Sequence, residues 1–298
     1  MIICRSVEEM RQWLRAQSAY RTGKTRTVGL VPTMGYLHDG HLSLVKRAKR
    51  ENDYTVLSIF VNPLQFGPTE DFERYPRDEE RDLALAEGVG TDAVFLPSLG
   101  AMYPDKPLTT VQVAGITEAL CGASRPGHFD GVATVVSKLF HIVDPDRAYF
   151  GMKDAQQVAV LTQMVNDLNL DTTIVRCPTL READGLALSS RNVYLTPEER
   201  SQATVLYKAL QALREALKDR ELTVAQAERL LMDTIQQSPL AVIEYAEVRT
   251  FPRLEAPARE SRMMEWIEHQ GTALIAALAV KFGNTRLIDN MVFDHDPE

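Results

Sequence analysis

The chain has 298 residues, of which 45% are hydrophobic, and a formal net charge of −8. This length corresponds to one large domain or two domains of ordinary size, and it can bury a full core without disulfides. The composition is typical of a globular protein and argues against wholesale disorder. The excess of acidic residues argues against an extended nucleic-acid-binding surface, because such surfaces are normally basic.

Three widely spaced cysteines, Cys4, Cys121 and Cys177, predict free thiols in a reducing compartment rather than a disulfide framework or a zinc site. The first residues lack the apolar stretch of a signal peptide. The longest apolar run, residues 273–280, is far shorter than the roughly 20 residues that a membrane helix needs. We therefore expect a soluble cytoplasmic protein that binds neither a membrane nor a nucleic acid.

Strand-like and helix-like segments alternate in the first part of the chain. Runs of apolar and β-branched residues predict strands at 27–33, 54–61, 93–97, 147–151 and 172–178. Helical spacing of apolar residues predicts helices at 41–52, 77–88, 129–142 and 154–168. Such alternation is typical of a mostly parallel sheet covered by helices on both faces, which binds ligands at the carboxyl ends of its strands.

The pattern changes near Pro178. Residues 197–237 have mostly helical spacing, and strand-like segments follow at 241–250, 272–280 and 285–293. Helices followed by neighbouring strands predict a small α+β domain. The predicted fold class is therefore α/β, with a parallel-sheet domain at residues 1–177 and a smaller α+β domain at residues 178–298.

The segment VPTMGYLHDGH, residues 31–41, lies between a predicted strand and a predicted helix. It ends in the pattern His-x-Gly-His, formed by His38, Asp39, Gly40 and His41. A helix N-terminus offers unpaired N–H groups and a partial positive charge, and imidazoles can donate to phosphoryl oxygens. The alternative is a helix cap with two exposed histidines. The position directly after a buried strand favours an anion site.

The loop FVNPLQFGPTEDFERYPRD, residues 60–78, leaves the second of these strands at its carboxyl end. Long loops in compact domains are often functional. Gln65 is a neutral donor and acceptor that could orient a hydroxyl or a carboxylate. An ordinary surface loop with Phe66 and Phe72 packed into the core explains the segment equally well.

Two polar segments carry weaker patterns. In residues 121–140, Arg125 and His128 are three positions apart before a helix and could bind an anion, although a plain loop-to-helix junction explains most of this composition. In residues 184–200, Ser189, Ser190 and Arg191 could hold a triphosphate through hydroxyls and a guanidinium. The alternative for this second segment is a Ser-rich turn before a helix.

The segment YFGMKDAQQ, residues 149–157, contains the end of a predicted strand at Gly151. Lys153 is a candidate phosphate contact, and Gln157 lies on the first turns of the following helix. Asp154 could serve only as a helix cap. The pattern is weak when it is taken alone.

Together and in this order, these segments resemble the pantothenate synthetase (pantoate–β-alanine ligase) family of the HxGH nucleotidyltransferase superfamily. The matching stretches run nearly from end to end and are VPTMGYLHDGH, SIFVNPLQF, YPRD, GASRPGHFDGV, GMKDAQQ, DGLALSSRN and TRLIDN. Each stretch is weak alone, but the set is highly specific. Residues 205–270 carry the least recognisable signal.

The resemblance implies a Rossmann-like nucleotidyltransferase fold, a smaller C-terminal domain that closes over the site, and a homodimer. It implies an enzyme in which the carboxylate of (R)-pantoate attacks the α-phosphate of ATP, with Mg²⁺ present, to give pantoyl adenylate and pyrophosphate. The amine of β-alanine would then release AMP and form pantothenate, the precursor of coenzyme A. Adenylation supplies the leaving group that a carboxylate lacks, so such an enzyme works by orientation and electrostatic stabilisation.

Matching positions also imply the site residues. The catalytic residues would be His38, His41, Lys153 and Arg191. The ATP-binding residues would be Met34, Gly35, Tyr36, Leu37, His38, Asp39, Gly40, His41, Gly151, Met152, Lys153, Asp154, Leu180, Leu188, Ser189, Ser190 and Arg191. The residues that bind the small substrates would be Gln65, Gln157, Arg125 and His128, and Asp82 would contact the magnesium ion.

The resemblance gives His41 the role of a proton donor. Stabilisation of phosphate charge fits the chemistry better, because adenylation of a carboxylate has no obvious proton to supply. Two other interpretations stay open. A nucleotidyltransferase or tRNA-charging enzyme shares the HxGH loop, although the acidic charge disfavours tRNA and the two glutamines favour a small polyol acid. A catalytically silent nucleotide-binding module is disfavoured by the intact catalytic positions.

Overall fold

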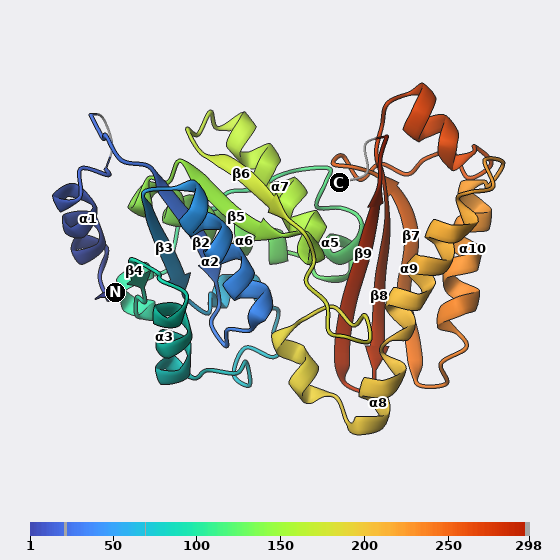
Figure 1. Cartoon of the computed structure of the whole chain (residues 1–298), viewed down its shortest axis with the longest axis horizontal. Helices are drawn as coiled ribbons and strands as arrows, with labels where there is room; N and C mark the ends of the chain where they lie inside the picture. Colours follow the sequence, from blue (N-terminus) through green and yellow to red (C-terminus); the bar gives the residue numbers. More distant parts are fainter. Residues whose placement is uncertain (21–22, 69, 296–298) are drawn as a thin grey trace. The chain divides into compact units, whose positions relative to one another are not determined.

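A computed structural model describes residues 1–20, 23–68 and 70–295, and the chain divides into two compact units (Figure 1). Unit 1 comprises Met1–Ala114, Arg125–Met152 and Val160–Pro178. Unit 2 comprises Gly115–Ser124, Lys153–Ala159 and Thr179–Glu298. The short segments Gly115–Ser124 and Lys153–Ala159 therefore belong to the same unit as the last two fifths of the chain.

Unit 1 is built on a parallel sheet, for which the described residues supply six strands. Their order across the sheet is β1 (Ile2–Cys4), β4 (Ala93–Phe95), β3 (Tyr54–Ile59), β2 (Val28–Thr33), β5 (Arg147–Gly151) and β6 (Thr173–Cys177). The predicted strands of the first part are confirmed. The edge strand β1 was not predicted, because three residues with two of them exposed leave no readable pattern.

Helices cover this sheet on both faces, as the alternating pattern predicted. The helices of unit 1 are α1 (Val7–Ala16), α2 (Asp39–Glu51), α3 (Glu79–Gly88), α4 (Leu99–Met102), α6 (His128–Val143) and the larger part of α7 (Ala155–Asp167), whose first residues belong to unit 2. Helix α2 packs against β2, β3 and β5, whereas α1 and α6 pack against each other. Because parallel crossovers are right-handed, α2 and α6 lie on opposite faces of the sheet. Nearly all side chains of α6 are buried, which identifies it as a central helix.

Unit 2 contains an antiparallel sheet, to which the described part of the chain contributes β7 (Ala241–Thr250), β8 (Leu274–Phe282) and β9 (Thr285–Phe293). Helices α9 (Val205–Ala216) and α10 (Val224–Ile235) pack on each other and on this sheet. Shorter helices are α5 (Leu120–Ser124), α8 (Pro197–Gln202), the 3-10 turn η3 (Ser190–Tyr194) and the π-helical turn η4 (Glu265–His269). The predicted α+β character is confirmed, with β8 beginning two residues later than expected.

Two sequence expectations concern single features of the chain. Cys4, Cys121 and Cys177 are buried free thiols, as expected. None of the helices in the described ranges is both long enough and apolar enough to cross a membrane.

A buried ion pair ties β9 to the segment that follows Pro178. Arg181 donates from both terminal nitrogens to Asp289, with distances of 2.6 and 2.9 Å to the two carboxylate oxygens. The Asp289 side chain is only 2% exposed, and the Arg181 guanidinium also lies 4.1 Å from the ring centre of Tyr207. Bidentate geometry of this kind makes a strong charge-assisted hydrogen bond.

Replacing Asp289 with Asn keeps the side-chain shape but removes the charge and one acceptor. Because Arg181 is largely buried and would lose one of the two acceptor oxygens that it binds, together with their negative charge, we expect the free energy of unfolding to fall by about 3 kcal/mol. Guanidinium chloride denaturation measures this change. Glu215→Gln, which alters an exposed ion pair with Lys218 in the same unit, is the control and should leave the midpoint unchanged. An unchanged midpoint for Asp289→Asn would show that the pair does not stabilise unit 2.

Candidate functional site

The turn between β2 and α2 is sharply bent at two residues. Gly35 has φ +83° and Tyr36 has φ 48°, both in the left-handed region. A Cβ atom at residue 35 would lie 2.9 Å from Asp82 Oδ2 and 3.0 Å from the Cγ2 atom of Ile59. Glycine is therefore the residue that both the backbone angle and the space require.

A buried carboxylate holds this turn. The Asp82 oxygens accept hydrogen bonds from the backbone N–H groups of Tyr36, at 2.6 Å, and Leu37, at 2.7 Å. Burial raises the pKa of the Asp82 carboxyl, against the opposing effect of these two N–H donors. The guanidinium of Arg81 lies 3.5 Å from the same carboxylate and 5.0 Å from the ring centre of Tyr36.

These contacts bear on the magnesium ion expected at Asp82. Each oxygen of the carboxylate already accepts a backbone N–H, and the residue is 1% exposed. Across the ranges that the structure describes, no group of three or more His, Cys, Asp or Glu side chains could hold a metal ion. Asp82 therefore anchors the turn, and its contact with a magnesium ion stays a prediction.

His38 and His41 cap α2 reciprocally. The Nδ1 atom of His38 accepts from Gly40 N at 3.1 Å, and the Nδ1 atom of His41 accepts from His38 N at 3.4 Å. The two rings stack with their centres 4.0 Å apart. An imidazole whose Nδ1 accepts carries its proton on Nε2, so both rings are fixed as Nε2 donors at the N-terminus of the helix. The cap and the anion site, weighed as alternatives in the sequence, are compatible.

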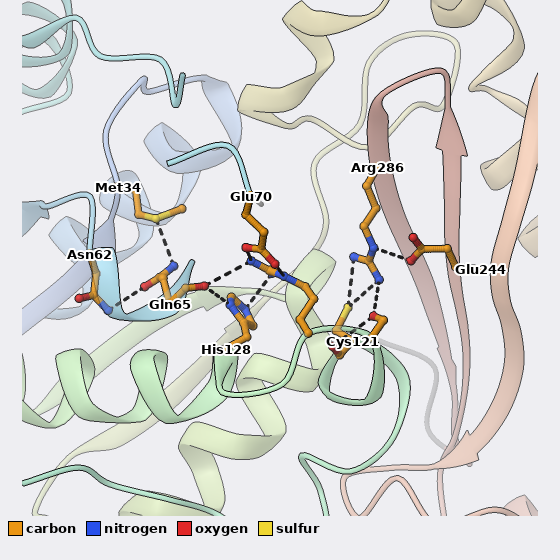
Figure 2. A network of polar contacts seen from close by, with 10 residues as sticks. Met34, Asn62, Gln65, Glu70, Cys121, His128, Glu244 and Arg286 are labelled. Atoms are coloured by element: carbon orange, nitrogen blue, oxygen red, sulfur yellow. Dashed lines mark hydrogen bonds and ion pairs between the residues drawn. The ribbon is translucent and has the colours of Figure 1, made fainter. Parts of the chain in front are cut away.

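The side chain of Gln65 is oriented by two neighbours (Figure 2). Its Oε1 accepts from Asn62 Nδ2 at 3.2 Å, and its Nε2 lies 3.1 Å from Met34 Sδ. Asn62 is itself fixed, because it also donates to the carbonyl of Gly131 and accepts from the hydroxyl of Tyr103. The amide of Gln65 is thereby held with its nitrogen on the side of the turn that follows β2.

The backbone of Gln65 lies directly against α6. The 3-10 turn η1 (Pro63–Gln65) approaches Gly131 so closely that a Cβ atom there would be 2.3 Å from Leu64 O and 2.6 Å from Gln65 N. No residue with a side chain fits at position 131 without displacing this turn.

His128 meets the backbone oxygen of Gln65 (Figure 2), and Arg125 contacts the same oxygen. His128 Nδ1 lies 2.7 Å from Gln65 O, and Arg125 lies 3.0 Å from His128 Nε2. Arg125 also forms a bidentate pair with Glu70, at 2.7 and 2.5 Å. Burial would raise the pKa of the Glu70 carboxyl, but the hydrogen bonds and charge of Arg125 outweigh it and hold that pKa below its usual value. A direct substrate contact of Arg125 or His128 stays a prediction.

A pocket of about 310 Å³ lies beside the turn in unit 1. It is lined by the turn itself, by residues at the ends of β3 and β4, and by charged residues in and before α3. The lining residues are Met34, Gly35, Tyr36, Ile59, Phe60, Val61, Phe72, Arg77, Asp78, Glu79, Asp82, Leu96, Pro97 and Leu99. β5 pairs with β2 in parallel, so Gly151, its last residue, and Met152, which follows it, lie where β5 ends at this same edge. This is the edge at which parallel sheets bind ligands.

The remaining predicted residues lie in unit 2. The backbone oxygen of Lys153 accepts from Asn290 Nδ2 at 2.8 Å, and Asp154 is exposed one residue later. Gln156 is buried and its amide bonds to the backbone of Ile116, Ala119 and Cys121, whereas Gln157 is half-buried. A contact between Gln157 and pantoate stays a prediction.

A short hairpin brings Leu180 and Leu188 together. Leu188 N donates to Leu180 O at 3.0 Å, and Arg181 and Ala187 form an isolated antiparallel bridge. Ser189 caps the turn η3, because its Oγ accepts from Arg191 N at 3.3 Å, and Ser190 is buried at the start of the turn.

Strand β9 connects the unit 2 candidates. Asn290 contacts Lys153, while the adjacent Asp289 holds Arg181 at the hairpin. The stretch TRLIDN matches the family, but the sequence predicted no role for Asp289 or Asn290. The sequence also predicted no role for Asn62, which lies in the matching stretch SIFVNPLQF, or for Glu70, which no sequence pattern marks.

This chain is similar to known proteins over almost its whole length. The model of the family described as pantoate-beta-alanine ligase matches residues 2–292. The pantothenate synthetase of Acetivibrio thermocellus is 54% identical over 99% of this chain and 100% of that protein.

Two solved structures are similar as well. The crystal structure of pantothenate synthetase from Thermus thermophilus has a TM-score of 0.87 at 48% identity, covering 98% of this chain and 99% of that one. The structure of pantoate-beta-alanine ligase from Francisella tularensis, complexed with beta-gamma ATP and beta-alanine, has a TM-score of 0.76 at 33% identity and covers 98% and 97%. The full-length match, together with the capped His-x-Gly-His turn, shows that the chain belongs to the pantoate–β-alanine ligase family.

Proposed function

We propose that this chain condenses (R)-pantoate with β-alanine at the expense of ATP, through pantoyl adenylate, and releases pyrophosphate and AMP. The observation that carries the adenylation step is the reciprocal cap of His38 and His41, which presents two Nε2 donors at a helix N-terminus. The identity of the acid and the amine rests on family membership. The product, pantothenate, would enter coenzyme A synthesis.

In the first step, a pantoate oxygen forms a bond to the α-phosphorus of ATP while the bond to the pyrophosphate oxygen breaks. Negative charge grows on the phosphate oxygens and on the departing pyrophosphate. The Nε2 donors of His38 and His41 and the N–H groups of the first turn of α2 stabilise that charge without transferring a proton. Lys153 and Arg191 contribute positive charge to the same phosphates.

In the second step, the β-alanine nitrogen bonds to the acyl carbon and the bond to the AMP oxygen breaks. The nitrogen loses a proton, and AMP leaves as an anion. Gln65 and Gln157 hold the pantoyl group, and Gln65 also contacts β-alanine. Positioning provides most of the rate enhancement in this step, because the adenylate is already a reactive acyl donor.

We further propose that ATP binds as its magnesium complex. Mg²⁺ prefers phosphate oxygens and water, so the nucleotide can carry the ion without Asp82. The further ATP contacts would come from the residues 34–41, 151–154 and 188–191 and from Leu180.

The state of the enzyme in the cell is also part of the proposal. We propose a cytoplasmic homodimer, in keeping with the family resemblance and with three buried cysteines that are free thiols. The division into an ATP- and pantoate-binding domain at residues 1–177 and a closing domain at residues 178–298 is proposed on the same resemblance.

Isotope exchange tests the reaction directly. The purified chain should exchange labelled pyrophosphate into ATP only when pantoate is present, and this exchange should not need β-alanine. With all three substrates, one AMP should form for each pantothenate. Exchange without pantoate, or ADP in place of AMP, would contradict the proposal.

His41→Ala and Lys153→Ala should each slow pantoate-dependent pyrophosphate exchange by about 10²-fold, because each removes a preorganised group from the phosphates. His41→Gln should retain part of the rate, since its amide N–H can replace the Nε2 donor but cannot act as an acid. The control is His141→Ala, whose exposed ring contacts only the backbone of α6. A rate for His41→Gln as low as that of His41→Ala would favour proton transfer by His41.

Gln65→Ala should raise the KM for pantoate about tenfold, which corresponds to the loss of roughly one hydrogen bond of 1.4 kcal/mol. The dissociation constant for ATP should change less than about twofold. Steady-state kinetics and calorimetry with ATP measure the two quantities. Gln12→Ala, at an exposed position of helix α1, is the control. Unchanged KM values for pantoate and β-alanine would remove Gln65 from the proposed pocket.

A further inference from the structure

Arg125 lies at the centre of a hydrogen-bonded chain that uses most of its donors inside unit 1. Its Nε and one terminal nitrogen bind Glu70, and its other terminal nitrogen lies 3.0 Å from His128 Nε2. The Glu70 and Arg125 side chains are 23% and 15% exposed. The two charges neutralise each other, so this group offers little net attraction to an anionic substrate.

The chemistry of the chain fixes the protonation of His128. A guanidinium can only donate, so His128 Nε2 must accept from Arg125, and the ring proton lies on Nδ1. That N–H then donates to the backbone oxygen of Gln65 at 2.7 Å, and Arg125 adds a longer contact of 3.4 Å to the same oxygen. The whole chain therefore ends on the backbone of the residue whose side chain is proposed to bind pantoate.

The other sides of Gln65 are already restrained. Asn62 and Met34 hold its amide, and Gly131 receives its backbone at close contact. The His128 contact supplies the remaining restraint, on the carbonyl. Because this carbonyl and the side-chain amide belong to the same residue, a displacement of the backbone at residue 65 would move the amide away from both of its partners.

Glu70 belongs to the loop that follows Gln65. Within this loop Phe66 packs against Phe72, at 5.3 Å between ring centres, and against Tyr75, at 6.0 Å. The Glu70–Arg125 pair joins this packed loop to the residues at the start of α6. The same guanidinium thus contacts both Glu70 and the backbone oxygen of Gln65.

We propose that Glu70, Arg125 and His128 are positioning residues, which fix the backbone of Gln65 and couple the pantoate pocket to the packing of Phe66, Phe72 and Tyr75. The part that concerns pantoate rests on the proposed function. In this proposal the three residues act through Gln65, in place of the direct substrate contact that the resemblance implies for Arg125 and His128.

The kinetic test uses Glu70→Gln, Arg125→Gln and the double variant. Each single change should raise the KM for pantoate about tenfold while the KM for ATP stays within about twofold, because only the small-substrate pocket loses its support. The double variant should be no worse than the poorer single variant, since both changes break the same chain. Glu73→Gln, which removes a charge from an exposed position of the same loop, should behave as the wild type.

His128 separates positioning from general stability. Asn at this position keeps an N–H near the place of Nδ1, whereas Leu keeps only the volume. His128→Asn should therefore keep most of the pantoate affinity that His128→Leu loses. The two variants should have equal melting temperatures. Equal loss in both variants would contradict a role through the carbonyl of Gln65.

Amide hydrogen exchange tests the structural part without any turnover. In Glu70→Gln and Arg125→Gln, exchange at residues 62–66 should quicken about tenfold, and exchange in α3 should not change. Wild-type exchange and wild-type KM values in both variants would overturn the inference. Altered exchange in a chain whose wild type forms no pantothenate would instead refute the proposed function and leave the positioning role standing.

Discussion

One buried carboxylate satisfies two backbone N–H groups in the turn that leads into α2. Asp82 accepts from Tyr36 and Leu37, and those two bonds hold a backbone that would otherwise be costly, because Tyr36 lies in the left-handed region. The orientation of the first turn of α2 follows from this arrangement, and with it the reciprocal cap of His38 and His41. The chemistry proposed for the phosphates depends on a residue that is itself hidden from solvent.

The second support is steric. Turn η1 rests on α6 at Gly131, and the amide of Gln65 takes its position from that contact. Hydrogen bonds from Asn62 and His128 then refine the orientation of the amide and the carbonyl. In unit 1, a carboxylate thus positions the histidines that are proposed to bind phosphates, and close backbone packing positions the glutamine that is proposed to bind the small substrates. The two supports are separate.

The elements could be predicted from sequence because burial leaves a periodic trace. The strands at 54–59 and 147–151 are nearly continuous apolar runs, and α6 is apolar on almost every side, so each is legible without a structure. β1 escaped because it is short and half exposed. The family match covers residues 2–292 and removes the interpretation as a tRNA-charging enzyme, which the HxGH pattern alone left open.

The supports of the site could not be predicted, because they join residues that are far apart in sequence. Glu70 and Arg125 are separated by 55 positions, and nothing near either residue marks its partner. Asp82 was predicted to contact magnesium, but its role as the anchor of the turn could not be predicted. The turn lies 46 residues away, and contact with it leaves no pattern around Asp82 in the sequence.

Gly131 takes no part in the chemistry, yet the structure restricts which substitutions are tolerated at this position. A methyl group there would push the backbone of residues 64 and 65 off α6, while the helix itself would accept alanine readily. A genetic screen would then recover changes at residue 131 as substrate-affinity mutants of a folded protein. The shape of the pocket therefore restricts the amino acid at a position that no substrate touches.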